Sequence, residues 1–180
     1  PTGVSRITYL EGINQYHFRG YDEAVNDWVV EANTSFGANT SADSSWYVYS
    51  GTAATWSRGA YSKKKFRRTA GLTLEYDAYM MPESGGSSVY SMVGFIGGDS
   101  TSHSYSQTPG NFTYHHTSGL QVYANTTGYS ADYSTDTKNA WWTFRIVLEN
   151  DGASHYVHAG GQWQLIKYVQ VNRQTDYEWV

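Results

Sequence analysis

The chain has 180 residues, no Cys and a formal net charge of −4 at pH 7. A chain of this length forms one domain with a sizeable core and needs no disulfides. The acidic balance excludes a globally basic nucleic-acid binder, and no apolar run approaches the ~18 residues of a membrane-spanning helix.

We therefore expect a single domain over residues 1–180, with no nucleic acid and no membrane span among its partners. The sequence starts at Pro1 without an initiator Met and stops in the strand-like segment 177–180. This favours a processed or excised segment of a larger protein, with neighbouring domains or assembly subunits as further partners.

Alternation of apolar and polar residues, with almost no helical periodicity, marks most of the chain. In chain order, strands are expected at residues 5–10, 27–32, 46–50, 72–80, 89–96, 119–124, 142–148, 154–159 and 162–171. Turn signals at Asn150-Asp151-Gly152 and Gly160-Gly161 join the last three strands into a meander. The stretches 34–45, 82–88, 97–110 and 125–139 are rich in Gly, Ser, Thr and Asn and are expected as loops.

Roughly ten strands at this spacing predict an all-β fold, a two-sheet antiparallel β-sandwich of the jelly-roll type. The period of two turns one face of each strand towards the core. The expected core residues are Leu72, Leu74, Tyr76, Phe144, Ile146 and Leu148.

Five segments together resemble concanavalin A-like lectin/glucanase domains. They are residues 47–51 (YVYSG), 71–80 (GLTLEYDAYM), 93–95 (VGF), 119–123 (GLQVY) and 142–148 (WTFRIVL), the last followed by the Asn150-Asp151-Gly152 turn. The resemblance covers about residues 45–170 and implies a two-sheet antiparallel jelly roll with a concave face. Members of this superfamily include carbohydrate-binding and laminin G-like modules, lectins, glycosidases, polysaccharide lyases and structural modules.

Aromatic residues are abundant, with 17 Tyr and 7 Trp in a chain that is only 39% hydrophobic. Rings with a polar handle suit surfaces that grip amphipathic ligands, and a sugar has an apolar C–H face and a polar rim. The candidate carbohydrate-binding rings are Trp46, Trp56, Tyr79 and Trp141, which lie off the apolar faces or in polar segments. Glu75 and Asp77 share the strand face of Tyr79 and are expected to accept hydrogen bonds from hydroxyl groups.

Glu75 and Asp77 are also the candidate catalytic pair if the protein is an enzyme, because glycosidases use two carboxyl groups. The laminarinase-like members of the superfamily carry E-x-D-x-x-E, and here Met80 stands where the second Glu is required. The alternative is that both acids are solvated strand residues or pair with Arg145 across the sheet. We expect no catalytic residues.

A basic segment contains Lys63, Lys64, Lys65, Arg67 and Arg68 around one Phe. Such a segment suits an anionic ligand, for example an acidic polysaccharide. The alternative is a strand edge or loop that is charged to prevent sheet-to-sheet aggregation.

No zinc site is expected at His115-His116 or at His155 and His158, because adjacent strand residues point to opposite faces. We expect these His residues to be polar residues of strands and turns. Asp99, Asp132 and Asp136 lie in oxygen-rich loops and are candidate calcium ligands, although no spaced calcium motif is present. No other cofactor is expected.

The favoured function is a non-catalytic, lectin-like carbohydrate-binding module of an exported or surface protein, with a polysaccharide or glycan as its partner. The alternatives are a structural or attachment module of a viral particle or cell-surface filament, and a glycan-cleaving enzyme. All three place the protein outside the cell, on a cell surface or on a virion. Four Asn-x-Ser/Thr sequons, at Asn33, Asn39, Asn111 and Asn125, are typical of such surfaces.

Overall fold

The computed structural model describes residues 2–11, 14–19, 26–30, 35–38, 46–49, 59–79, 90–97, 110–116, 119–125, 127–133, 140–170 and 177–179. Nearly all of these residues lie in antiparallel strands or the turns between them, which confirms the all-β prediction. Within these ranges, no helix is long and apolar enough to cross a membrane.

Sixteen strands make up the described fold. They are β1 (Thr2–Glu11), β2 (Asn14–Arg19), β3 (Trp28–Val30), β4 (Ser35–Ala38), β5 (Trp46–Tyr49), β6 (Ala60–Ser62), β7 (Phe66–Arg67), β8 (Thr73–Tyr79), β9 (Tyr90–Gly97), β10 (Gly110–His116), β11 (Gly119–Ala124), β12 (Thr127–Ser130), β13 (Trp141–Leu148), β14 (Gly152–Ala159), β15 (Gln162–Gln170) and β16 (Tyr177–Trp179).

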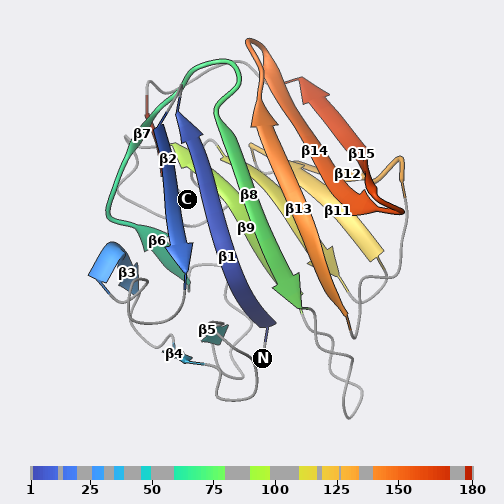
Figure 1. Ribbon diagram of the computed structural model, residues 1–180. Coiled ribbons are helices and arrows are strands. Elements are labelled where there is room, and N and C mark those ends of the chain that lie inside the picture. The colour runs from blue at the N-terminus through green and yellow to red at the C-terminus, as the bar shows by residue number, and fades with distance from the viewer. Residues whose placement is uncertain are drawn as a thin grey trace.

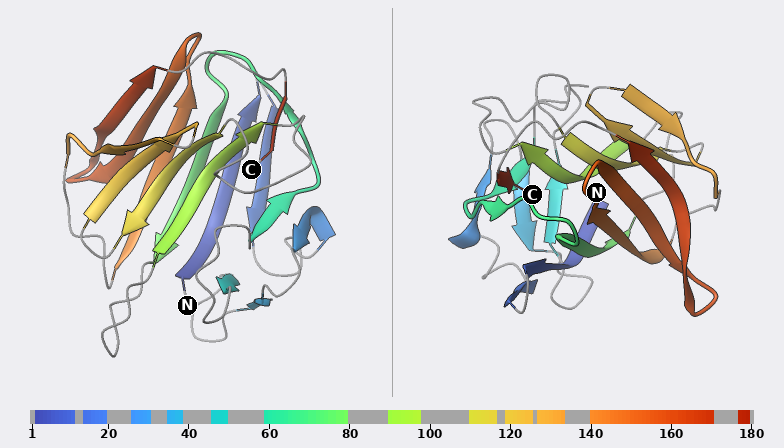
Figure 2. Two further views of the ribbon diagram at one scale, coloured as in Figure 1. Left: turned by 180° about the vertical axis from the view of Figure 1, so that it is seen from behind. Right: turned by 90° about the horizontal axis from the view of Figure 1, so that it is seen from above.

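Two antiparallel sheets lie face to face, as expected for a two-sheet sandwich (Figure 1, Figure 2). The eight-stranded sheet has the order β15-β14-β13-β8-β1-β5-β4, with β2 paired to β1. The six-stranded sheet has the order β12-β11-β10-β9-β16-β7. Strands β3 and β6 form a separate two-stranded sheet.

The core lies between the two larger sheets and contains all six residues that the alternation predicted. Leu72, Leu74, Tyr76, Phe144, Ile146 and Leu148 are each at most 1% exposed. The six-stranded sheet contributes Phe95, Leu120, Val122 and Ala124 to the same cluster. The ring of Phe144 stacks on Tyr76, with centroids 5.4 Å apart. The outward residues of β8 and β13 are therefore left for the surface.

The C-terminal meander is also confirmed. Strand β13 continues through Asn150-Asp151-Gly152 into β14, and the Glu149 N–H donates to the Gly152 carbonyl. Strands β14 and β15 are joined at Gly160 and Gly161, whose φ angles are +61° and +79°. Because only glycine adopts such angles without strain, this pair fixes the hairpin and the register of β15.

Two predicted loops are wrong in part. Residues 34–45 contain β4, and residues 125–139 contain β12. Strand β12 pairs with β11, yet three of its four residues are exposed. Such a strand has no buried face and therefore no alternation to detect. Strands β2, β6, β7 and β10 were likewise not predicted.

A small polar network crosses the core between the sheets. The Tyr76 hydroxyl of β8 lies 3.1 Å from His115 Nε2 of β10. The Thr113 hydroxyl of β10 lies 3.0 Å from His155 Nδ1 of β14. Both pairs are buried, and the His115 ring meets Phe144 edge-on at 4.6 Å. Each sheet therefore supplies one partner of each hydrogen-bonded pair.

Burial sets the protonation of this network. It lowers the pKa of His115 to about 4 and the pKa of His155 to about 3, because desolvation disfavours the charged ring. Burial also raises the pKa of Tyr76. At neutral pH all three side chains are uncharged.

We predict that Phe144→Ala lowers the free energy of unfolding by ~3–5 kcal/mol, because it removes a buried ring between Tyr76 and His115. Urea denaturation measures the change. Val147→Ala, on the outward face of the same strand, is the control and should cost much less. Equal losses in the two variants would contradict the assigned core.

We further predict that stability falls as the pH drops below 6.5. In the unfolded chain both His rings have a pKa near 6.5, but in the folded protein they stay neutral down to about 4 and about 3. The unfolded chain therefore binds more protons over this window, and each His should cost about 2 kcal/mol between pH 6.5 and about pH 5.

The measurement is urea denaturation across that pH range, where most carboxylates stay ionised. His115→Gln and His155→Gln should each flatten the pH dependence, whatever their effect at neutral pH. Curves that run parallel to that of the parent would show that the two rings do not titrate on unfolding.

Candidate functional site

The outward face of β8 and β13 brings together four of the six predicted carbohydrate-binding residues: Glu75, Asp77, Tyr79 and Trp141. In the register of these strands, Trp141 pairs with Tyr79, Thr143 with Asp77 and Arg145 with Glu75. All six residues alternate with buried core positions, so they share one face of the eight-stranded sheet.

The half-buried ring of Tyr79 and the exposed ring of Trp141 form a pair at one end of this face. Their centroids are 5.6 Å apart and their planes are tilted by 54°. Trp141 is 40% exposed, whereas its neighbour Trp142 packs against the core. The predictions that Trp141 lies off the apolar face and that Tyr79 shares the face of the two acids are therefore confirmed.

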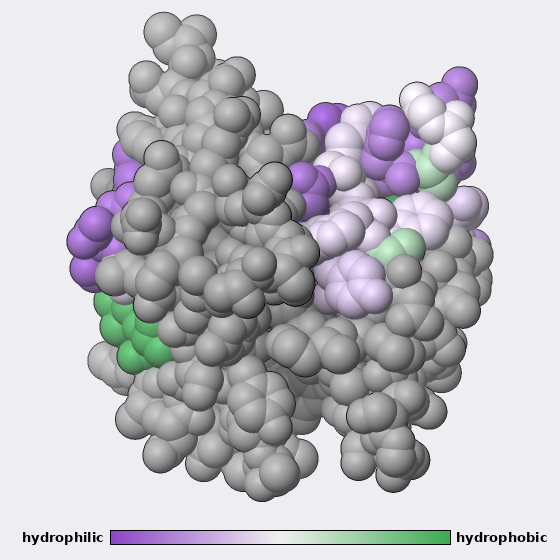
Figure 3. Space-filling model, turned by 60° about the horizontal axis from the view of Figure 1, so that its bottom comes forward, coloured by the Kyte–Doolittle hydropathy of each residue, from purple (hydrophilic) through white to green (hydrophobic). Residues whose placement is uncertain are grey.

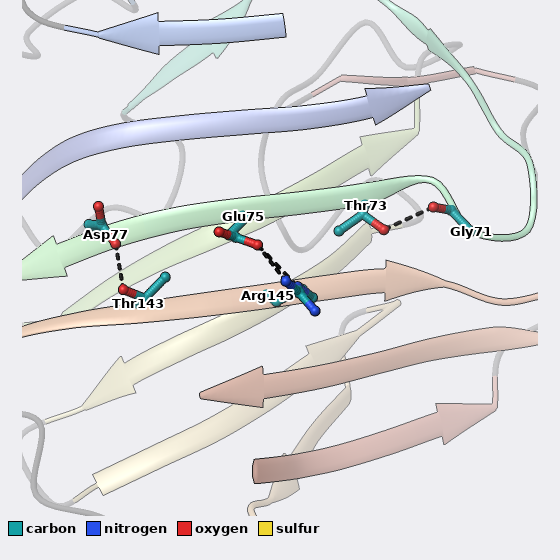
Figure 4. A network of polar contacts seen from close by, with 6 residues as sticks. All are labelled: Gly71, Thr73, Glu75, Asp77, Thr143 and Arg145. Carbon is teal, nitrogen blue, oxygen red and sulfur yellow. Dashed lines mark hydrogen bonds and ion pairs between the residues drawn. The ribbon is translucent and has the colours of Figure 1, made fainter. Parts of the chain in front are cut away.

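Both acids are bonded to side chains of β13 (Figure 4). The Thr143 hydroxyl donates to Asp77 Oδ1 at 2.6 Å. Arg145 donates from Nε and Nη2 to Glu75 Oε2, at 3.1 and 2.7 Å. The predicted pairing of Glu75 with Arg145 across the sheet is confirmed. The two acids and their partners make a strip of donors and acceptors beside the ring pair.

Sequence reasoning missed Trp163 on β15. The Arg145 Cζ lies 3.9 Å from the centroid of its ring, and the His158 ring lies 5.1 Å from it. Strands β13 and β15 are separated by β14, so the indole reaches back over β14 to meet the guanidinium. The sequence does contain a signal for an outward Trp163. The residue stands between Gln162 and Gln164 directly after the Gly160-Gly161 turn, at the start of a strand with few apolar neighbours.

The surface over β13–β15 combines rings with polar groups. At the upper right of Figure 3 the coloured residues are mostly hydrophilic or of intermediate hydropathy, whereas a hydrophobic group lies at the left. The exposed large hydrophobic residues of β13 and β15 are Trp141, Leu165 and Tyr168. This is the composition expected of a surface that stays in water and binds an amphipathic ligand.

Two predicted site residues cannot be placed on this face. The backbone of Trp46 pairs with Val4 and Ala38 in the eight-stranded sheet, but its side chain lies outside the described residues. Trp56 lies wholly outside them. Their role in binding stays a prediction.

The basic segment does not form one cationic surface. Lys63, Lys65 and Arg67 are exposed, whereas Arg68 is only 5% exposed and Phe66 is fully buried. The Lys63 ammonium donates to the Asn26 carbonyl at 2.6 Å, and Lys64 lies over the Phe66 ring. Strand β7 ends the described order of the six-stranded sheet. This position suits the charged-edge reading, and the anionic-ligand patch stays a prediction for the exposed cations.

The described part of the chain contains no group of three His, Cys, Asp or Glu side chains that could hold a metal. Asp132, one calcium candidate, is paired with the Lys167 ammonium at 2.5 Å. Asp99 and Asp136 lie outside the described residues, so calcium stays untested. His115 and His155 are strand residues as expected, but both are buried, which was not predicted.

One sequon is inaccessible in the folded protein. Asn111 lies in β10 and is 3% exposed, with a buried carboxamide oxygen. Asn125 follows β11 with φ at +46° and is half-buried. Asn33 and Asn39 lie outside the described residues.

Comparison with known proteins does not assign a family. No protein-family model matches the chain, and no curated protein matches it. The function therefore has to be argued from the site itself.

We predict that Glu75 and Arg145 are energetically coupled. A double-mutant cycle with Glu75→Gln and Arg145→Met should give a coupling of about 1 kcal/mol in urea denaturation, because the pair is partly desolvated and has two donated bonds. The more exposed pair of Lys167 and Asp132 is the matched control and should couple by much less. A coupling no larger than that of the control would show that the pair does not order this face.

Proposed function

We propose that this protein is a non-catalytic, lectin-like carbohydrate-binding module that holds its ligand on the outward face of β8 and β13. The single observation that carries the proposal is the pair of the exposed Trp141 ring and the half-buried Tyr79 ring, beside the bonded polar strip of Asp77 and Thr143. A sugar ring stacks its C–H face on such rings while its hydroxyls bond to nearby carboxylates and hydroxyls.

The fold proposal is a concanavalin A-like jelly roll. Its supports are the antiparallel pairing within the two large sheets and the adjacent position of β8 and β13, which contain two of the five segments that carry the resemblance. The same proposal places the module outside the cell, on a cell surface or on a virion, where polysaccharides are exposed.

The contacts of the two acids favour binding over catalysis. A glycosidase needs one carboxyl group as acid and one as nucleophile or base. Here Glu75 accepts two bonds from a guanidinium and Asp77 accepts one from a hydroxyl, so both are held as acceptors. Release of reducing ends from a polysaccharide panel, abolished by Glu75→Gln or Asp77→Asn, would instead support the enzyme alternative.

A glycan microarray tests the proposed function directly. Binding to a defined group of glycans supports it. A blank array, with folded protein confirmed by circular dichroism, would reject it and leave the structural or attachment module as the better explanation.

We predict that Trp141→Ala and Tyr79→Ala each weaken glycan binding by ~1–3 kcal/mol, the usual value of one stacked ring. Both residues lie off the core face, so the melting temperature should stay nearly constant. Titration calorimetry measures binding and scanning calorimetry measures melting. Tyr168→Ala, which removes an equally exposed ring on β15, is the control and should bind as the parent does. Parent-like binding by both variants would place the site elsewhere.

A further inference from the structure

A second aromatic contact lies on the same face, beyond the Tyr79–Trp141 pair. Trp163 of β15 is half-buried, so part of its indole faces solvent beside Arg145 and His158. A ligand that is long enough can contact both the Tyr79–Trp141 pair and Trp163.

The register places the two aromatic contacts well apart. In the antiparallel register Phe144 lies opposite Val157, so the preceding residue of β13, Thr143, lies opposite His158. His158 in turn pairs with Trp163 of β15. Trp163 is therefore two strands and two residue steps from Trp141. With ~4.8 Å between strands and ~3.4 Å per residue, their Cα atoms are roughly 12 Å apart. This is wider than one sugar ring, so a ligand that meets both contacts is an extended chain.

Arg145 lies two residues beyond Thr143 on β13, in contact with the Trp163 ring, and is held from two sides. Glu75 accepts from its Nε and Nη2, and Trp163 lies against its guanidinium. Among the described residues, none accepts a hydrogen bond from Arg145 Nη1. A fixed planar donor of this kind is preorganised to bond hydroxyl oxygens, with little rotamer entropy left to lose.

The charges on this face do not favour an anionic ligand. Glu75 is paired with the guanidinium of Arg145, and Asp77 adds a second carboxylate on the same face. The described side chains of β8 and β13 on this face therefore carry no positive excess. The exposed cations of the basic segment flank β7, which belongs to the other sheet.

We propose that the ligand is an uncharged, extended polysaccharide chain that crosses β13 and β14 from the Tyr79–Trp141 pair to Trp163, with Arg145 donating to hydroxyls beside Trp163. This inference rests on the proposed function and deepens it by naming the substrate class. It makes Trp163 and Arg145 determinants of the preference for long over short oligosaccharides.

The test measures affinity by titration calorimetry for short and long neutral oligosaccharides. The probes are cellobiose and cellohexaose, xylobiose and xylohexaose, mannobiose and mannohexaose, and laminaribiose and laminarihexaose, with hexagalacturonate as the acidic counterpart. At least one neutral hexasaccharide should bind more tightly than its disaccharide. Its affinity should stay nearly constant from about 0.1 M to about 1 M salt, over which the Debye length falls from about 10 Å to about 3 Å.

Trp163→Ala should lower the affinity for that hexasaccharide by about 5- to 150-fold, the value of one lost stacking contact. It should leave the affinity for the disaccharide unchanged, whereas Trp141→Ala should weaken both. Arg145→Lys, which keeps the charge but loses the planar donor, should also weaken the hexasaccharide selectively. Tyr168→Ala and the double variant Lys65→Glu with Arg67→Glu are the controls and should bind as the parent does.

Several results would overturn the inference. They are preference for hexagalacturonate with a steep loss in salt, equal affinity for disaccharide and hexasaccharide, and unchanged hexasaccharide binding by Trp163→Ala. Failure of every neutral hexasaccharide to bind, with a positive glycan array, also overturns it but leaves the proposed function standing. If the array is blank as well, both fall together. Melting temperatures close to that of the parent confirm that each variant is folded.

Discussion

The pairing of β8 with β13 is the constraint on which both faces of the sheet depend. Its register sets Phe144 opposite Tyr76 and, one residue further, Arg145 opposite Glu75. A shift by a single residue would turn every core side chain to solvent and bury the charged pair. Hydrophobic burial on the inner face therefore holds the outer residues in place. The candidate site lies on strands that the core already requires.

Much of this arrangement could be predicted from alternation and turn signals. The segments 72–80 and 142–148 alternate and contain β8 and β13, and the turns at Asn150-Asp151-Gly152 and Gly160-Gly161 predicted the strands that follow them, β14 and β15. Strand β12 escaped prediction because its residues are mostly exposed and its place comes from pairing with β11. Hairpin pairing of an exposed strand with its neighbour in sequence leaves no periodicity to detect.

The candidate site was predictable to the same extent. Alternation set Tyr79, Glu75 and Asp77 on one face and Trp141 on the outer side of its strand, but the sequence does not show which strands are neighbours. The contact of Trp163 with Arg145 depends on β14 and β15 folding back beside β13. The burial of Arg68 beside three exposed cations likewise follows from the position of β7, not from the charge of the segment.

The polar pairs inside the core limit how the two sheets can be stacked. Apolar attraction is non-directional, so apolar faces alone restrict the relative offset of two sheets less strictly than hydrogen bonds do. Tyr76, His115, Thr113 and His155 tolerate few offsets, since a displaced sheet would leave these polar atoms without partners in an apolar layer. His155 Nε2 already lies buried without one. Exchanging the four for aliphatic residues would therefore free the sheets to slide, giving a family of similar sandwiches instead of a single structure.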